Sequence, residues 1–375
     1  MKIALLTEKY TPDFGGLAIS SGRLARLLSS VGHDVRVYSP SPNLPPSEKR
    51  TLTSSGVIVT RFGTHKRVDD TLVEWFELIV EEHNREPFDV LHAYFLPQAG
   101  FIASYAGKYL NIPNVVSIRG NDIERAVFDP SKFSHVMYAL HNASAVTTNA
   151  NQLIEKAKAL IDRDIKLIPN GVDTGLFKPI PRNEDLAKAI GINGGLVIGF
   201  VGELREKKGM QTILHAYTQT DKQYSSTLLV IGDVRGGDDM KAFEEFQHTY
   251  PDSNIIVTGH IPHNDLPAYY SLMDMLVHPS RRDGMPNAVL EAMACERAVI
   301  ATSIGGIKDI VEDGKNGIIV NINDANMLTK KILELLEDSE KRSRLGKNAR
   351  ELIVSQYTLE QELEANLSIY RKLGL

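Results

Sequence analysis

The sequence predicts an α/β fold of two Rossmann-like domains, each built on a doubly wound parallel sheet, facing each other across a cleft. The chain has 375 residues, which is more than one hydrophobic core usually organises. Short apolar runs alternate with helix-length segments through both halves, a pattern typical of parallel sheets covered by helices. The proline-rich stretch KPIPR at 178–182 separates the halves and indicates a linker.

The first half begins with a strand, a glycine loop and a helix. Ile3 to Leu6 is a short apolar run, Gly15 and Gly16 follow it, and a helix-like segment runs from Ser20 to Val31. A second helix is predicted at 70–82. Further strands are predicted at 34–38, 57–61, 89–93, 115–118, 145–148 and 165–168.

The second half repeats the same alternation without repeating the sequence. Helices are predicted at 209–219, 240–249, 267–273 and 287–295, and the chain ends with a mainly helical region whose last helix covers 359–373. Strands are predicted at 196–201, 227–232, 255–259, 275–279 and 299–302. Ligands of doubly wound sheets bind beyond the carboxyl ends of the strands, so the loops that follow these strands are the first places to look for a site.

Composition limits the function. The net charge is -5 and the isoelectric point is near 6.1, whereas proteins with a broad nucleic-acid surface are usually strongly basic. No apolar run reaches the length of a membrane span, and the apolar start is too short for a signal peptide, so we expect a cytoplasmic protein. The single cysteine, Cys295, lies in an apolar helical stretch and is expected to be buried.

Four segments of the sequence resemble motifs of a known family. They are HPSRRDGMPNAVLEAMACERAVIAT at 278–302, VGELREKKG at 201–209, IPNGVD at 168–173 with FKP at 177–179, and FGG at 14–16. In their order along the chain, these segments resemble those of family 4 of the retaining glycosyltransferases, which have the GT-B fold. In that family two glutamates separated by seven residues flank a donor-site loop, and here Asp283 and Glu291 keep the spacing.

The resemblance implies two domains and a metal-independent transfer from a nucleoside diphosphate sugar. An acceptor domain would span 1–175 and include the final helix at 357–375, which crosses back in relatives, and a donor domain would span 183–356. The resemblance also implies a front-face route in which the leaving phosphate takes the acceptor proton. The sequence departs from the family pattern at Asp283, at Glu203 where arginine is frequent, at Arg119 where histidine is common, and at 296–298.

Breaking a bond to a diphosphate requires stabilisation of the charge that develops on the phosphates. Arg205 and Lys208 are the candidate cations, and the helix that begins near Asn287 offers a positive dipole end. By resemblance, Glu291 holds the ribose hydroxyls and Asp283 the hydroxyls of the donor sugar. The remaining donor-binding candidates are Gly15, Gly16, Gly284, Met285, Pro286, Asn287, Ala288 and Ile261, the last of which is expected either to pack on the base or to lie in the core.

Arg119, Asn121 and Asp122 follow a strand of the first half and are expected to contact the sugar or the acceptor, or alternatively to form a structural turn. The acceptor remains open between a small molecule, a glycan and a lipid. The thin basic surface supports at most peripheral membrane contact. No cofactor and no metal ligand set is predicted.

Two alternatives remain. A non-catalytic sugar- or nucleotide-binding protein would keep the same fold, since fold does not fix function. An NAD-dependent oxidoreductase or epimerase would be expected to carry the GxGxxG fingerprint, and the loop at Gly15 and Gly16 lacks it.

Overall fold

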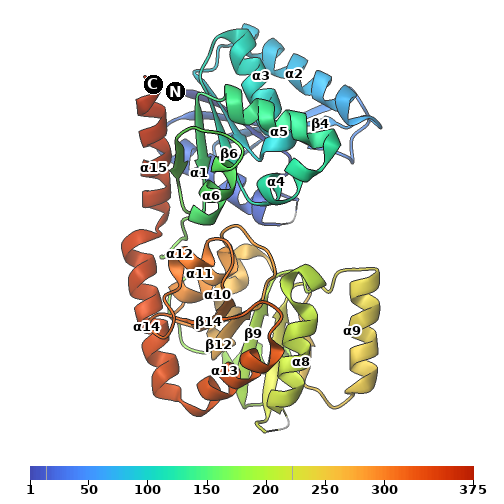
Figure 1. Ribbon diagram of the computed structural model, residues 1–375, viewed down its shortest axis with the longest axis vertical. Helices are drawn as coiled ribbons and strands as arrows, with labels where there is room; N and C mark the ends of the chain where they lie inside the picture. Colours follow the sequence, from blue (N-terminus) through green and yellow to red (C-terminus); the bar gives the residue numbers. More distant parts are fainter. Residues whose placement is uncertain (14, 222) are drawn as a thin grey trace. The chain divides into compact units, whose positions relative to one another are not determined.

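The computed structural model describes residues 1–13, 15–221 and 223–375. The chain divides into two compact units, one formed by Met1–Asn170 with Glu360–Leu375 and the other by Gly171–Leu359 (Figure 1). Each unit has one sheet that is wholly or mainly parallel, and helices accompany the strands of each unit. The predicted α/β class is therefore confirmed.

The sheet of the first unit has the order β3-β4-β2-β1-β5-β6-β7-β8. All neighbours pair in parallel except β3 and β4, which form an antiparallel edge. The strands are β1 Lys2–Thr7, β2 Asp34–Ser41, β3 Lys49–Ser54, β4 Val57–Gly63, β5 Val90–Tyr94, β6 Asn114–Ile118, β7 Ala145–Thr148 and β8 Ile165–Leu167. The helices are α1 Gly16–Ser30, α2 Val68–Arg85, α3 Phe101–Leu110, α4 Asn121–Glu124, α5 Pro130–Asn142, α6 Asn151–Lys158 and α15 Leu359–Lys372.

Alternating residues of β1 supply two cores on opposite faces of this sheet, as the period of a strand requires. Ala4 and Leu6 pack in the core shared with α2, α3 and α5. Ile3 and Leu5 pack in the core shared with α1 and α15, whose Tyr370 is fully buried. Strands buried on both faces read as continuous apolar runs, which is why β1 was visible in the sequence.

The last helix is held to the first unit by polar contacts as well as by its apolar residues. Arg23 of α1 donates from Nε to Glu362 Oε2 at 2.6 Å. Tyr370 Oη lies 2.6 Å from His92 Nδ1 on β5. Burial lowers the pKa of His92 to about 3, with a further lowering from Arg119, so this ring is neutral at physiological pH.

The sheet of the second unit is fully parallel, with the order β11-β10-β9-β12-β13-β14. Its strands are β9 Leu196–Val201, β10 Ser226–Ile231, β11 Ile255–Val257, β12 Met275–His278, β13 Ala298–Thr302 and β14 Ile318–Val320. Its helices are α7 Glu184–Ala189, α8 Met210–Asp221, α9 Asp238–Thr249, α10 Leu266–Leu272, α11 Asn287–Ala294, α12 Ile307–Ile310, α13 Ala325–Glu337 and α14 Ser339–Gln356.

This sheet also separates two cores. Val197 of β9 packs in one core with α10 and α11, and its neighbour Ile198 packs in the other with α8 and α13. Cys295 is buried in the first of these cores, as expected, and burial raises the pKa of its thiol to about 12.

The structure differs from the predicted elements in several places. α1 begins at Gly16, four residues before the predicted start at Ser20, and Gly15 is its N-cap residue with φ 113°. The helices α3, α4, α6 and α7 and the strands β3 and β14 were not predicted. Every residue of β3 is exposed, and β14 has only three residues. Within the described residues, no helix combines the length and the apolar character needed to cross a membrane.

Candidate active site

The predicted donor residues of the second unit gather at one edge of its sheet. Arg205 and Lys208 follow β9, Ile261 follows β11, and the segment from Asp283 to Ala288 connects β12 to α11. The strands are parallel, so their carboxyl ends meet at the same edge. This is the edge at which doubly wound sheets bind ligands.

Two glycines allow the loops at this edge to touch. Gly209 has φ 80°, and a Cβ on it would lie 2.1 Å from the carbonyl oxygen of Pro279 in the loop after β12. Gly305 has φ 48°, and a Cβ there would lie 2.0 Å from the carbonyl oxygen of Asp283. A side chain at either position would push the loops apart, so these glycines set the position of Lys208 against Asp283.

Lys208 and Asp283 form an ion pair between Nζ and Oδ2. His278, buried at the end of β12, lies with Nε2 3.3 Å from the same oxygen. Burial alone would raise the pKa of Asp283, but Lys208 and His278 outweigh it, and the pKa lies well below its usual range. The carboxylate is therefore ionised at any working pH. Burial lowers the pKa of His278, and Asp283 opposes that shift.

Arg205 has an acidic partner of its own. Its Nη1 lies 3.0 Å from Glu203 Oε2, and its Nε is buried without a hydrogen-bond partner among the described residues. Glu203 is one of the four places at which this chain departs from the family pattern, and its carboxylate offsets the charge of Arg205.

Glu291 lies in the second turn of α11 and is 5% exposed. Its Oε1 accepts a hydrogen bond from His263 Nε2 at 2.9 Å, and its Oε2 accepts one from Tyr270 Oη at 2.9 Å. Sequence reasoning missed His263, Tyr270 and His278. The available signal was a polar residue directly after an apolar strand for His278; the other two lie 28 and 21 residues from Glu291 and needed the fold to bring them together.

The loop before Glu291 is mostly buried. Met285 is in the core and a Cβ on Gly306 would touch it, so its side chain serves packing. Gly284 and Pro286 are also buried, whereas Asn287 and Ala288 are half-buried at the start of α11. The N-cap residue of this helix is Pro286, whose side chain makes no capping hydrogen bond. Ile261 is half-buried and packs on the same core, in line with the second of its two predicted roles.

In the first unit, Gly15 and Gly16 begin α1 directly after the loop that follows β1. Phe14 of the predicted glycine loop lies outside the described residues. A Cβ on Gly15 or Gly16 would meet no described protein atom within 4 Å. Packing against described residues therefore does not explain a glycine at Gly16.

Arg119, Asn121 and Asp122 follow β6, but they have different surroundings. Asp122 is fully buried, and its carboxylate accepts hydrogen bonds from the amides of Arg119, Gly120 and Ile123 at 2.8–3.1 Å. Burial raises its pKa to about 6, against the effect of these amides. Asp122 therefore forms a structural turn, which was the alternative expected from the sequence. The structure does not support the direct contact between Asp122 and a substrate.

Arg119 is positioned by this turn. Its guanidinium lies over the ring of Tyr94 at 3.8 Å, and Nη1 donates to Asn170 Oδ1 at 3.1 Å. The aromatic face and the amide hold a partly exposed cation at the carboxyl end of β6. Asn121 is exposed at the start of α4.

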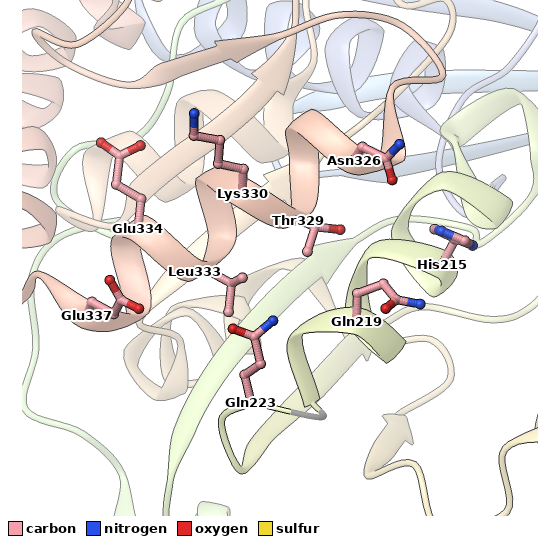
Figure 2. Close-up of a pocket in the computed structure, with 9 residues that line it drawn as sticks. All are labelled: His215, Gln219, Gln223, Asn326, Thr329, Lys330, Leu333, Glu334 and Glu337. Atoms are coloured by element: carbon pink, nitrogen blue, oxygen red, sulfur yellow. The ribbon is translucent and has the colours of Figure 1, made fainter.

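Figure 2 shows a groove between α8 and α13 in the second unit, with a volume of about 750 Å³. None of the predicted site residues lines it, and it presents one lysine, Lys330, beside Glu334 and Glu337. Its charge does not favour a diphosphate. Within 1–13, 15–221 and 223–375, no three His, Cys, Asp or Glu side chains are grouped to hold a metal ion.

Two family models match the chain. The model described as Glycosyltransferase Family 4 matches residues 14–176, and the model described as Glycosyl transferases group 1 matches residues 182–352. The two matches lie one after the other and together cover almost the whole chain. The N-acetyl-alpha-D-glucosaminyl L-malate synthase of Bacillus anthracis is 22% identical over 99% of this chain and 97% of its own length.

Solved structures show the same fold. The sucrose-phosphate synthase of Thermosynechococcus elongatus matches with a TM-score of 0.83 at 21% identity, over 99% of this chain and 98% of that chain. HepE of Anabaena, solved in complex with UDP and glucose, matches with a TM-score of 0.83 at 19% identity, over 99% of this chain and all of its own. Both comparisons support the GT-B fold predicted from the sequence.

Proposed function

Because this chain belongs to the group 1 glycosyl transferases of the GT-B fold, we propose that it moves a sugar from a nucleoside diphosphate sugar to an acceptor hydroxyl with retention of anomeric configuration. The observation that carries the proposal is the ion pair between Lys208 and Asp283, which joins the loops at the carboxyl ends of β9 and β12. The loop that carries Asp283 leads into α11, the helix that carries Glu291. A cation, a carboxylate and a helix start are groups that a nucleotide sugar requires.

Each group has a part in donor binding. Lys208 and Arg205 bind the diphosphate, and the amide end of α11 adds favourable potential for an anion. Glu291 accepts from the ribose hydroxyls and Asp283 from the hydroxyls of the sugar, because ionised carboxylates only accept. Ile261 packs on the core with one side, and in this proposal its exposed side contacts the base. Gly15 and Gly16 of the first unit also bind the donor in this proposal, because a glycine without packing contacts at a helix start lets a ligand approach the backbone.

The transfer forms one bond and breaks one. The acceptor oxygen attacks the anomeric carbon on the face from which the diphosphate departs, and the bond between that carbon and the phosphate oxygen breaks. The acceptor proton passes to the departing phosphate oxygen, so no separate general base is needed. Lys208 and Arg205 stabilise the charge that grows on the phosphates. We propose that these cations remove the need for a divalent metal, which activity in excess EDTA would test.

The acceptor meets the first unit at Arg119 and Asn121. The partly exposed guanidinium of Arg119 offers donors to a hydroxyl or an acidic group, and Asn121 is exposed two residues further along the chain. The acceptor class stays open between small molecules, glycans and lipids. The name of the Bacillus anthracis relative includes L-malate, so hydroxy acids belong in the first acceptor panel.

The experiment that tests the proposal is thermal unfolding of the purified protein with UDP, GDP, ADP and NAD added separately in EDTA. A ligand that binds only the folded state raises the midpoint as its concentration exceeds its dissociation constant. A rise with one nucleoside diphosphate supports the proposal and identifies the base. A rise with NAD alone, or with none of the four, contradicts it.

A further inference from the structure

Glu291 is held by two side chains from a single short stretch of chain. His263 lies in a helical turn, His263–Asp265, just before α10, and Tyr270 lies within α10. His263 Nε2 and Tyr270 Oη approach opposite oxygens of the carboxylate, each at 2.9 Å. Within the described residues these are the two hydrogen bonds that the carboxylate accepts.

In both hydrogen bonds to Glu291 the carboxylate is the acceptor and the ring group is the donor. An ionised carboxylate only accepts, so His263 Nε2 carries a proton in this contact. Tyr270 is fully buried, and burial together with the Glu291 charge raises the pKa of its hydroxyl well above its usual range. Tyr270 therefore remains a donor throughout the working pH range. Its hydroxyl lies 2.9 Å from Glu291 Oε2 and 3.2 Å from a second acceptor, the carbonyl oxygen of Ala288, so the charged and nearer carboxylate is the stronger acceptor.

The two rings are themselves fixed by packing. Phe177 contacts the His263 ring edge to face, with centroids 5.0 Å apart, and the Tyr270 ring with centroids 5.9 Å apart. Phe177 is fully buried. The side chain of His263 is 39% exposed, so the carboxylate it holds lies at the border between core and solvent.

The Glu291 carboxylate keeps acceptor positions that His263 and Tyr270 do not use. A carboxylate has about four acceptor positions, two on each oxygen. His263 takes one position on Oε1 and Tyr270 takes one on Oε2, so each oxygen keeps one. One remaining acceptor position on each oxygen matches a pair of neighbouring hydroxyls that each donate one hydrogen bond, such as the 2′ and 3′ hydroxyls of ribose.

We propose that His263 and Tyr270 are positioning residues that fix the Glu291 carboxylate against the ribose diol and thereby make the enzyme prefer ribonucleotide to 2′-deoxyribonucleotide donors. The inference rests on the proposed function, which assigns the ribose to Glu291, and it adds the two residues that hold the Glu291 carboxylate in place. Without His263 the Glu291 carboxylate can rotate toward Tyr270 or toward solvent. Binding then weakens most for the nucleotide that donates to both carboxylate oxygens, which is the one with both ribose hydroxyls.

The experiment measures dissociation constants of UDP and 2′-deoxy-UDP by calorimetry, or of the corresponding pair if thermal unfolding selects another base. The variants are His263→Ala, His263→Gln and Tyr270→Phe. Glutamine places an amide nitrogen near the position of Nε2 and keeps the hydrogen bond. His248→Ala, an exposed histidine in α9, is the matched control. Thermal midpoints without ligand identify any variant that fails to fold.

We expect wild type to bind UDP roughly tenfold more tightly than 2′-deoxy-UDP, the loss typical of one hydrogen bond to a charged group. His263→Ala weakens UDP binding by about tenfold and 2′-deoxy-UDP binding by less, so the preference shrinks toward unity. His263→Gln restores it, Tyr270→Phe acts like His263→Ala, and His248→Ala changes nothing. In turnover assays the donor KM rises more than kcat falls.

Two results would overturn the inference while leaving the proposed function intact: an unchanged preference in His263→Ala, or an equal loss for both nucleotides that glutamine does not restore. The second would mean that His263 only supports the fold. Failure of the wild type to bind UDP, GDP or ADP would instead overturn the proposed function, and the inference with it.

Discussion

Lys208 and Asp283 form an ion pair at the edge of the second sheet, although 75 residues separate them in the sequence. One arrives on the loop after β9 and the other on the loop after β12. In the proposed reaction a diphosphate would share Lys208 with Asp283, so the pair holds the cation in place before the donor arrives. Such preorganised charge is the main source of transition-state stabilisation in many enzymes.

Replacing Lys208 with methionine should lower kcat/KM for the donor by about 100-fold, because a cation that stabilises the departing phosphate is lost. Lys208→Arg should retain part of the activity. The measurement is initial-rate kinetics of nucleoside diphosphate release. Lys241→Met, which removes an exposed lysine of α9, should behave as wild type. Equal kinetics for Lys208→Met and Lys241→Met would remove Lys208 from the reaction.

Acid should erase the stabilising effect of Asp283. Its pKa in the folded state lies well below its usual range, while in the unfolded chain it is about 3.9. A carboxyl with a depressed folded pKa adds stability above the unfolded pKa and loses it as the pH falls toward the folded value. Urea unfolding should therefore show wild type more stable than Asp283→Asn at pH 7, with a gap that narrows below about pH 4. A gap that is independent of pH would contradict the ion pair.

Glu203→Gln should strengthen donor binding, since it removes the carboxylate that lies 3.0 Å from Arg205 and competes with the diphosphate. Partly exposed ion pairs contribute up to about 1 kcal/mol, so the expected gain in affinity is at most roughly fivefold. Calorimetry with UDP measures it, and Glu244→Gln on the exposed side of α9 is the control. Weaker binding in Glu203→Gln would show that Glu203 supports the donor site.

Gly209→Ala should destabilise the second unit more than Gly191→Ala does. Both glycines have positive φ, at 80° and 89°, but only the Cβ at Gly209 meets a backbone oxygen, at 2.1 Å, whereas the Cβ at Gly191 meets nothing within 4 Å. The shared left-handed conformation costs about 1–2 kcal/mol in each variant, and the difference in unfolding free energy reports the contact with Pro279. Equal destabilisation would argue against close approach of these loops.

The sequence predicted the parts of the fold and site that depend on local pattern. Strands such as β1, β9 and β12 are apolar runs, and the loops after them carry Gly15, Lys208 and Asp283 in the order that the family resemblance implies. Edge strand β3 escaped because all its residues are exposed. The roles of Tyr270 and His263 could not be predicted because their partner Glu291 is distant in sequence. The structural role of Asp122 could not be distinguished from a substrate contact because the same motif serves both.

The most direct test of the account is the affinity of UDP, or of whichever nucleoside diphosphate stabilises the protein, for wild type and for Glu291→Gln. Glutamine keeps the shape of Glu291 but replaces one acceptor oxygen with a donor. The account predicts that Glu291→Gln folds and binds the nucleotide at least about tenfold more weakly, the loss expected for a hydrogen bond to a charged group. Equal affinity for the two proteins would contradict the assignment of Glu291 to the donor ribose and, with it, the location of the donor site.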